Sequence, residues 1–191
     1  MRMLLLAPPG AGKGTLGDGL ADHYGIAHLS SGEILRAQIR AGSQLGREVA
    51  AVVAAGDLVP DAVLESLMRP AISAAAQAGG YVLDGFPRNL AQARSAHGWA
   101  VEQEIRLHAV VHLDVPPDVL AARLVARAGV EGRSDDTPAT VRRRMDVYWS
   151  DTAPLLNYYG GRGLVLDVDG TPQPGEVLAA AVKALAAFTT G

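Results

Sequence analysis

Cysteine is absent from this chain of 191 residues, and aromatic residues and lysine are scarce. The absence of cysteine excludes disulfides and thiolate metal sites, and it fits a reducing compartment such as the cytoplasm. Aromatic residues make up only 5% of the chain, whereas alanine is abundant, so we expect an aliphatic core. Lysine occurs only at Lys13 and Lys183, against 15 arginines. Lysine at position 13 of so arginine-rich a chain indicates a need for a compact ammonium group there.

A strong net charge and long apolar runs are also missing. The formal net charge of −3 argues against bulk attraction to nucleic acid or to an anionic membrane. No apolar run reaches membrane-spanning length, and Met1 leads directly into an expected strand, which leaves no room for a signal peptide. The five histidines are scattered, so no set of three or four metal ligands stands out. The length suits one domain with a substantial core.

Short apolar runs alternate with stretches of helical spacing along the whole chain. We expect strands at 3–6, 26–29, 81–83, 109–115 and 164–168. We expect helices at 13–24, 31–41, 45–55, 61–78, 89–99, 116–127, 138–159 and 174–188, with a kink or break at Pro70. Alternating strands and helices predict an α/β fold with a five-stranded parallel sheet covered by helices on both faces. Ligands of such folds bind at the carboxyl ends of the strands.

The first fifteen residues, MRMLLLAPPGAGKGT, join an apolar strand to a glycine-rich turn and a helix start. This is the structural context of a phosphate-binding P-loop. Glycines let backbone N–H groups approach phosphate oxygens, and Lys13 supplies a mobile positive charge. The loop departs twice from the pattern G-x-x-x-x-G-K-[ST], because Ala7 replaces the first glycine and Gly14 replaces Ser/Thr, with Thr15 one place later. We therefore predict a three-layer P-loop NTPase fold.

Asp84 directly follows the expected strand 81–83, where P-loop proteins place the carboxylate that manages Mg²⁺. By itself, an aspartate after a strand is more often a helix cap. Its position together with the glycine loop favours the functional interpretation.

Arginines are concentrated between residues 123 and 144. Arg123 and Arg127 are four apart and share a helix face, and Arg133 lies in a glycine-flanked loop. The three consecutive arginines at 142–144 cannot all face one way, so we expect Arg144 to point inward and the other two to lie at the surface. Guanidinium groups from several elements, Arg36 and Arg88 included, suit a polyphosphate during phosphoryl transfer. An acceptor that is itself a phosphate is already anionic, so a general base is dispensable.

Together these segments resemble the adenylate kinases, a family of nucleoside monophosphate kinases, along nearly the whole chain. The resemblance is carried by PPGAGKGT (8–15), SSGEILR (30–36), GDLVPD (56–61), DGFPRNLAQ (84–92), RLVAR (123–127), GRSDD (132–136) and RRRM (142–145). It implies reversible transfer of the terminal phosphoryl group from MgATP to AMP, giving two ADP. Mg²⁺ is the implied cofactor, with no direct protein ligand and with Asp84 reaching it through water.

The resemblance also implies the roles of individual residues. Catalysis is assigned to Lys13, Asp84, Arg88, Arg123, Arg127, Arg133 and Arg144. ATP binding is assigned to Gly10, Ala11, Gly12, Lys13, Gly14, Thr15, Arg123, Arg127 and Gly170. AMP binding is assigned to Ser31, Arg36, Asp57, Leu58, Val59, Gly85, Phe86, Pro87, Arg88, Gln92, Arg133 and Arg144. Within this last set, Ser31 and Gln92 are the residues expected to recognise the base.

The resemblance further implies one domain with two moving parts. These parts are an AMP-binding segment at 30–59 and a short lid at 126–134, on a core made of 1–29, 60–125 and 135–191. The lid is a short loop of the bacterial type rather than a long hairpin, and without cysteines it cannot be stapled by zinc. We expect a cytoplasmic monomer whose partners are ATP, AMP and ADP, with no nucleic acid and no membrane.

Three other interpretations were weighed. A UMP/CMP kinase of the same family is favoured slightly by Asn89, but Ser31 and Gln92 stand where that subfamily usually has alanine and asparagine. A GTPase-like switch needs an N-K-x-D motif, and no lysine follows an asparagine in this chain. A catalytically degenerate nucleotide-binding protein has only Ala7 in its favour.

Overall fold

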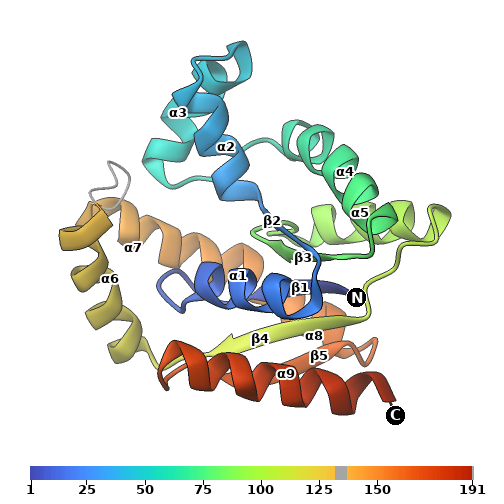
Figure 1. The fold of residues 1–191 in the computed structure, drawn as a ribbon. Coiled ribbons are helices and arrows are strands. Elements are labelled where there is room, and N and C mark those ends of the chain that lie inside the picture. The colour runs from blue at the N-terminus through green and yellow to red at the C-terminus, as the bar shows by residue number, and fades with distance from the viewer. Residues whose placement is uncertain (132–136, 191) are drawn as a thin grey trace.

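Five parallel strands form one sheet in the order β2-β3-β1-β4-β5 (Figure 1). The structure, a computed structural model, describes the backbone of residues 1–131 and 137–190, with the side chains of 1–124 and 137–188. The strands are β1 (Arg2–Leu6), β2 (Ala27–Ser30), β3 (Tyr81–Asp84), β4 (Ala109–Asp114) and β5 (Val165–Asp169). The predicted α/β class and the five-stranded parallel sheet are confirmed.

Helices fill the connections between strands, close to the predicted bounds. They are α1 (Lys13–Tyr24), α2 (Ser31–Arg40), α3 (Gln44–Ala55), α4 (Asp61–Gln77), α5 (Leu90–Glu102), α6 (Pro117–Glu131), α7 (Pro138–Val147), α8 (Pro154–Gly160) and α9 (Pro174–Thr190). The expected cap of α2 forms, because the Ser30 side chain accepts a hydrogen bond from the Glu33 N–H.

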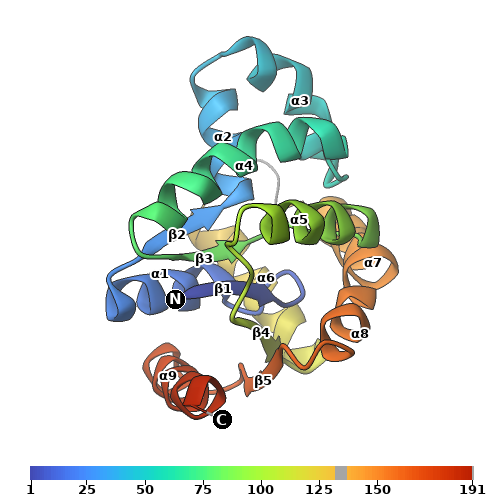
Figure 2. The ribbon, with the colours of Figure 1, turned by 90° about the vertical axis from the view of Figure 1, so that its right-hand side faces the viewer.

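Side chains of the central strand alternate between two cores, one on each face of the sheet. Met3 and Leu5 pack with buried residues of α1 and α9, such as Leu20 and Leu185. Leu4 and Leu6 pack on the opposite face with buried residues of α4, α5 and α8. Both faces are apolar, and this is why β1 reads as an unbroken hydrophobic run. Figure 2 shows α9 on one side of the sheet and α4 and α5 on the other.

Two helical predictions need correction. The helix α4 continues through Pro70, so the expected break does not occur, while a kink at Pro70 stays a prediction. The single helix expected over 138–159 is divided, because a π-helical turn, η1 (Tyr148–Thr152), separates α7 from α8. A π turn shifts the hydrogen bonds by one residue while leaving the helical path nearly continuous, so the apolar spacing of the sequence does not reveal it.

The sheet topology places the glycine loop at the centre of one edge. β1 lies between β3 and β4. The strands β2 and β3 lie on one side of β1 and the strands β4 and β5 on the other, which makes the carboxyl end of β1 a topological switch point. The helices α2 and α3 stand apart from the sheet, at the top of Figure 1, on the side opposite α9. The segment from Gly10 to Gly12 and the residue Asp84 therefore lie at the same edge, as predicted from their places after β1 and β3.

Candidate active site

The glycine loop adopts a conformation that requires glycine at two positions. Gly10 and Gly12 have φ angles of 86° and 95°, in the left-handed region. A Cβ at Gly10 would also lie 2.8 Å from the Leu124 side chain, so the loop packs directly on α6. Gly12 is the N-cap of α1 and offers no side chain to the first-turn N–H groups. Those N–H groups and the positive end of α1 are suited to binding an anion.

Lys13 extends back over the loop that precedes it. Its Nζ donates hydrogen bonds to the carbonyl oxygens of Ala7 at 2.7 Å and Pro8 at 3.1 Å. Ala7 is buried and does not have a positive φ, since Glu104 is the one non-glycine residue with a positive φ among those the structure describes. The missing first glycine of the motif therefore causes no backbone strain, and Ala7 serves through its carbonyl group.

A cavity of about 530 Å³ opens beside this loop and contains most of the residues that the sequence proposed as site residues. Its lining includes the proposed residues Gly10, Gly12, Lys13, Gly14, Thr15, Ser31, Arg36, Asp57, Leu58, Val59, Asp84, Gly85, Pro87, Arg88, Arg123 and Arg144. These residues come from the glycine loop, α2, the segment after α3, the end of β3 and the turn after it, the middle of α6, and α7. Side chains that lie far apart in sequence, such as Lys13 and Arg144, thus share one cavity.

Arg88 contributes a guanidinium group to the cavity wall. Its Nε donates to the Gly85 carbonyl at 2.8 Å. Burial lowers the pKa of the Arg88 guanidinium, Asp84 opposes that shift, and the positive charges of Arg144 and Arg36 lower the pKa further. Three guanidinium groups close enough to repel one another create a strongly positive region, which an anionic ligand would stabilise.

Gly85 joins Ser31 to Arg88 through its carbonyl oxygen. The Ser31 Oγ donates to that oxygen at 2.7 Å, alongside the bond from Arg88. A Cβ at Gly85 would lie 2.5 Å from the Ser31 Oγ, and its φ of 78° lies in the left-handed region. Only glycine fits this point, where the end of β3 approaches the start of α2.

A second cavity, of about 360 Å³, lies on the other side of the loop and shares Gly12, Thr15 and Arg123 with the first. Its lining also includes the proposed residues Ala11 and Gly170. The Arg123 guanidinium donates to the carbonyl oxygens of Gly170 at 2.8 Å and of Thr171 at 3.0 Å. Arg123 therefore ties the loop after β5 to α6, and the two cavities meet at the start of α1.

Four of the proposed residues are not placed on either cavity wall. Phe86 and Gln92 are buried behind the wall, with 1% and 0% of their surface exposed. The Arg127 side chain and the whole of Arg133 lie outside the residues that the structure describes. Of the expected lid at 126–134, residues 126–131 continue the helix α6 instead of forming a loop, and 132–134 lie outside the described residues.

Several residues that the sequence did not single out contact the site. Thr152 lines the first cavity from the π turn, and its Oγ1 donates to the Arg88 carbonyl at 2.7 Å. Arg143, expected to be a plain surface charge, is exposed but pairs with Asp57 at 2.6 Å. Asp61 accepts a hydrogen bond from the Gln92 side chain at 2.7 Å. Its place in the GDLVPD segment was a signal for Asp61, whereas nothing in the sequence marked Thr152.

Comparison with known proteins decides the family. The family model described as "Adenylate kinase" matches residues 5–164. The chain belongs to the adenylate kinase family. Proteins named adenylate kinase from Stenotrophomonas maltophilia (strain R551-3) and Xylella fastidiosa (strain 9a5c) are each 44% identical over 185 residues. In both comparisons the match covers 97% of this chain and 99% of the relative.

Membrane-spanning helices and clusters of metal ligands are both missing from the described part of this adenylate kinase family member. Within residues 1–131 and 137–190, no helix is both long enough and apolar enough to cross a membrane. Over the same residues, no three His, Cys, Asp or Glu side chains gather as a metal site.

Proposed function

We propose that this protein is an adenylate kinase that transfers the terminal phosphoryl group of MgATP to AMP, reversibly, giving two ADP. One observation carries the proposal: Lys13 of the phosphate loop lines the same cavity as the three arginines Arg36, Arg88 and Arg144. Such a cavity suits a reaction in which two phosphate groups meet and in which charge builds up on the transferred group. The relatives that are named adenylate kinase support the same activity.

The two connected cavities suggest where each nucleotide binds. The second cavity is lined by Gly170 and Arg123 and opens onto the start of α1, so we assign it to the ATP base, with the triphosphate along residues 10–15. The first cavity then receives AMP, its phosphate near Arg36 and Arg88 and its base toward Ser31 and Val59. On the basis of family resemblance, we also assign recognition of this base to Gln92, which lies behind the cavity wall. Arg123 and Arg144 flank the transferred group, and we assign Arg127 and Arg133 the same task on the basis of family resemblance.

The residues present fit a Mg²⁺ ion carried by ATP. Asp84 Oδ1 is buried and accepts no hydrogen bond from any described residue, although Asp84 lines the first cavity. An unsatisfied carboxylate oxygen of this kind suits a water ligand of Mg²⁺, and we assign it that role. When bound with ATP, Mg²⁺ neutralises phosphate charge. Lys13 and the arginines orient the two phosphate groups and stabilise the charge that develops between them.

We assign closure of the site to the segment 30–59 and to the short lid at 126–134. The segment meets α7 through polar contacts, among them the Asp57–Arg143 ion pair and the hydrogen bond from Thr140 Oγ1 to the Ala54 carbonyl. Such surface polar contacts can break and re-form as the segment moves. This suits a moving part that excludes water during transfer. We further propose that the protein acts as a cytoplasmic monomer, because one chain supplies both cavities and all the cations named above.

A coupled assay with MgATP and four acceptors tests the proposal. AMP should be phosphorylated with production of two ADP per AMP, and CMP, UMP and GMP at no more than a few per cent of that efficiency. Equal or better use of CMP and UMP would favour the pyrimidine kinase of the same family. ATP binding without turnover of any acceptor would identify a degenerate nucleotide-binding protein.

A further inference from the structure

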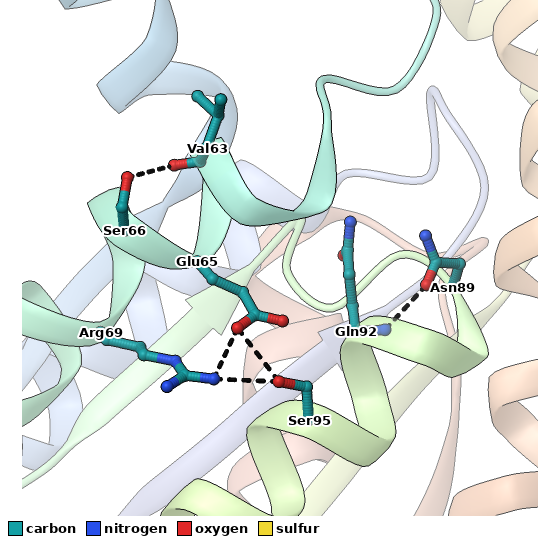
Figure 3. Close-up of polar contacts among 7 residues, drawn as sticks. All are labelled: Val63, Glu65, Ser66, Arg69, Asn89, Gln92 and Ser95. Atoms are coloured by element: carbon teal, nitrogen blue, oxygen red, sulfur yellow. Dashed lines mark hydrogen bonds and ion pairs between the residues drawn. The ribbon is translucent and has the colours of Figure 1, made fainter.

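The side-chain amide of Gln92 makes two hydrogen bonds: its oxygen meets a donor and its nitrogen meets an acceptor. Its Oε1 accepts from the backbone N–H of Arg88 at 2.8 Å, and its Nε2 donates to Asp61 Oδ1 at 2.7 Å. Gln92 has no exposed surface, so no solvent competes for these bonds. Figure 3 shows Gln92 next to Asn89 at the start of α5, facing α4. The amide is therefore held between the two helices and the residue that carries the buried guanidinium.

These two partners fix which end of the amide is oxygen and which is nitrogen. A backbone N–H can only donate, and an ionised carboxylate can only accept. Turning the amide by half a rotation would set Oε1 against the Asp61 carboxylate and Nε2 against the Arg88 N–H, losing both hydrogen bonds. One of the two bonds is charge-assisted and so among the stronger kinds. The opposite orientation is accordingly disfavoured in a buried site.

An amide fixed in this way keeps one N–H and one oxygen lone pair, in known order. A ligand meets them when its binding displaces the atoms that cover Gln92 in this structure. The remaining N–H of the amide matches a ring-nitrogen acceptor, and its remaining lone pair matches an exocyclic amino group. Adenine offers that pair at N1 and its 6-amino group, whereas hypoxanthine and guanine carry an N1–H donor and a 6-oxo acceptor. With hypoxanthine or guanine, the base N1–H would face the amide N–H and the 6-oxo group would face the amide oxygen. Neither hydrogen bond would form.

We propose that Asp61 is a specificity-determining residue of the acceptor site: by fixing the polarity of the Gln92 amide, it selects 6-aminopurine over 6-oxopurine monophosphates. The inference rests on the proposed function, in which Gln92 recognises the acceptor base. By the same rule, the site rejects UMP, whose uracil has the oxo pattern. It leaves the exclusion of CMP to the size of the base, because cytosine shares the amino pattern of adenine.

Asp61 is itself held in place for this task. It is the first residue of α4, and its Oδ1 also accepts from the Asn89 side-chain amide at 3.1 Å. Asn89 in turn caps α5 through its own side-chain oxygen, which accepts from the Gln92 backbone N–H at 2.8 Å. The beginnings of the two helices are thus joined through one carboxylate oxygen, and Gln92 cannot change orientation without disturbing that junction.

Inosine monophosphate provides the test, because it differs from AMP only in the 6-position and the N1 proton. We compare kcat/KM for AMP and for IMP in the full chain and in Asp61→Asn, whose amide can meet Gln92 with either its donor or its acceptor end. The ratio of AMP to IMP efficiency should fall about tenfold or more in the variant, the effect of losing one charge-assisted bond. The KM for ATP should not change.

Glu65→Gln is the matched control. Glu65 lies one turn further along α4 and contacts Arg69 at 2.5 Å and Ser95 at 3.0 Å, but not Gln92 (Figure 3). It makes the same acid-to-amide change between the same two helices, so the AMP/IMP ratio should stay at the wild-type value. If Asp61→Asn folds poorly, Asp61→Ser replaces it, because serine is favoured at helix starts and its hydroxyl both donates and accepts.

The outcomes distinguish the proposed adenylate kinase activity from the specificity role of Asp61. Wild-type protein that phosphorylates no AMP refutes the proposed function. Wild-type protein that uses AMP and IMP equally well refutes the specificity role alone. So does a folded Asp61 variant that keeps the wild-type ratio, or a Glu65→Gln control that loses it to the same extent. A further fall caused by Asp61→Asn in a Gln92→Ala background would show that Asp61 does not act through Gln92.

Discussion

The Thr152 hydroxyl donates a hydrogen bond to the backbone carbonyl oxygen of Arg88 at 2.7 Å, across 64 residues of sequence. The Arg88 N–H is bound by Gln92, and the Arg88 Nε by the Gly85 carbonyl. Two local contacts and one from a distant part of the chain therefore fix Arg88. Arg88 requires such support, because its guanidinium lies near two other positive charges that repel it when no anion is bound.

Removing only the Thr152 hydroxyl should weaken AMP binding and leave ATP binding unchanged. Thr152→Val keeps the shape but leaves the Arg88 carbonyl without its partner, which costs about 1 kcal/mol, or about fivefold in the KM for AMP. Thr152→Ser keeps the hydroxyl and should restore most of the wild-type KM. Steady-state kinetics with each nucleotide varied in turn measure both effects. Equal changes in the KM values for AMP and ATP would mean that Thr152 only stabilises the fold.

Lys13→Met should lower kcat by about a hundredfold to a thousandfold, which is the range for losing one group that stabilises transition-state charge. Lys13 starts α1, and its ammonium group lies over the loop carbonyls, near the position we assign to the ATP phosphates. Lys183→Met is the matched control, since Lys183 is the other lysine of the chain and is exposed on α9. The control should keep wild-type kcat. Near-normal turnover in Lys13→Met would reject the assignment of the loop.

Ala7→Gly should leave ATP affinity within about twofold of the wild type, because Ala7 already has an ordinary backbone conformation. Its carbonyl, which accepts from Lys13, is present in either residue. The variant should lose about 0.5–1 kcal/mol of stability, since glycine has more backbone freedom to lose on folding. Calorimetric titration with ATP and thermal unfolding measure the two quantities. A large gain in ATP affinity would instead show that the alanine methyl group impairs the loop.

Much of the fold was predictable because it depends on local patterns. The apolar run of β1 and the helical spacing of α1 surround a glycine loop, and each of these signals lies within a few residues of the next. The prediction that Arg144 faces inward rested on a similarly local fact, namely that consecutive helical residues point in different directions. Its side chain does line the first cavity. The parallel sheet also followed from the alternation of strands and helices.

The remaining features depend on contacts between distant segments or on hydrogen-bond shifts without a compositional signature. The π turn is made of ordinary helical residues, so nothing in the sequence distinguishes Thr152 from its neighbours. Asp61 and Gln92 meet across 31 residues, and Asp57 and Arg143 across 86. Such pairs depend on how α4, α5 and α7 pack against each other. The spacing of apolar residues predicts each helix, but it does not determine how one helix is rotated relative to the next.

The environment of His108 gives a prediction for stability as a function of pH. The Arg2 backbone N–H donates to His108 Nδ1 at 3.1 Å, and the Arg2 guanidinium lies 3.0 Å from Nε2. Burial lowers the pKa of His108 in the folded protein, and the charges of Arg2 and the N-terminus lower it further. A histidine with a lowered folded pKa favours folding when it is neutral. That contribution is complete above the unfolded pKa of about 6.5 and is lost as the pH falls from there through the folded value.

The midpoint temperature of unfolding should therefore decrease between pH 7.5 and pH 5 by more in the wild type than in His108→Gln. Glutamine can accept from the Arg2 N–H but takes up no proton in this range, so the variant lacks the penalty that acid imposes on the histidine. The other four histidines are common to both proteins and cancel in the comparison. Circular dichroism melts at several pH values measure the difference. If the two proteins lose stability in parallel on acidification, the cations around His108 have no effect on its protonation, and the acid sensitivity arises elsewhere.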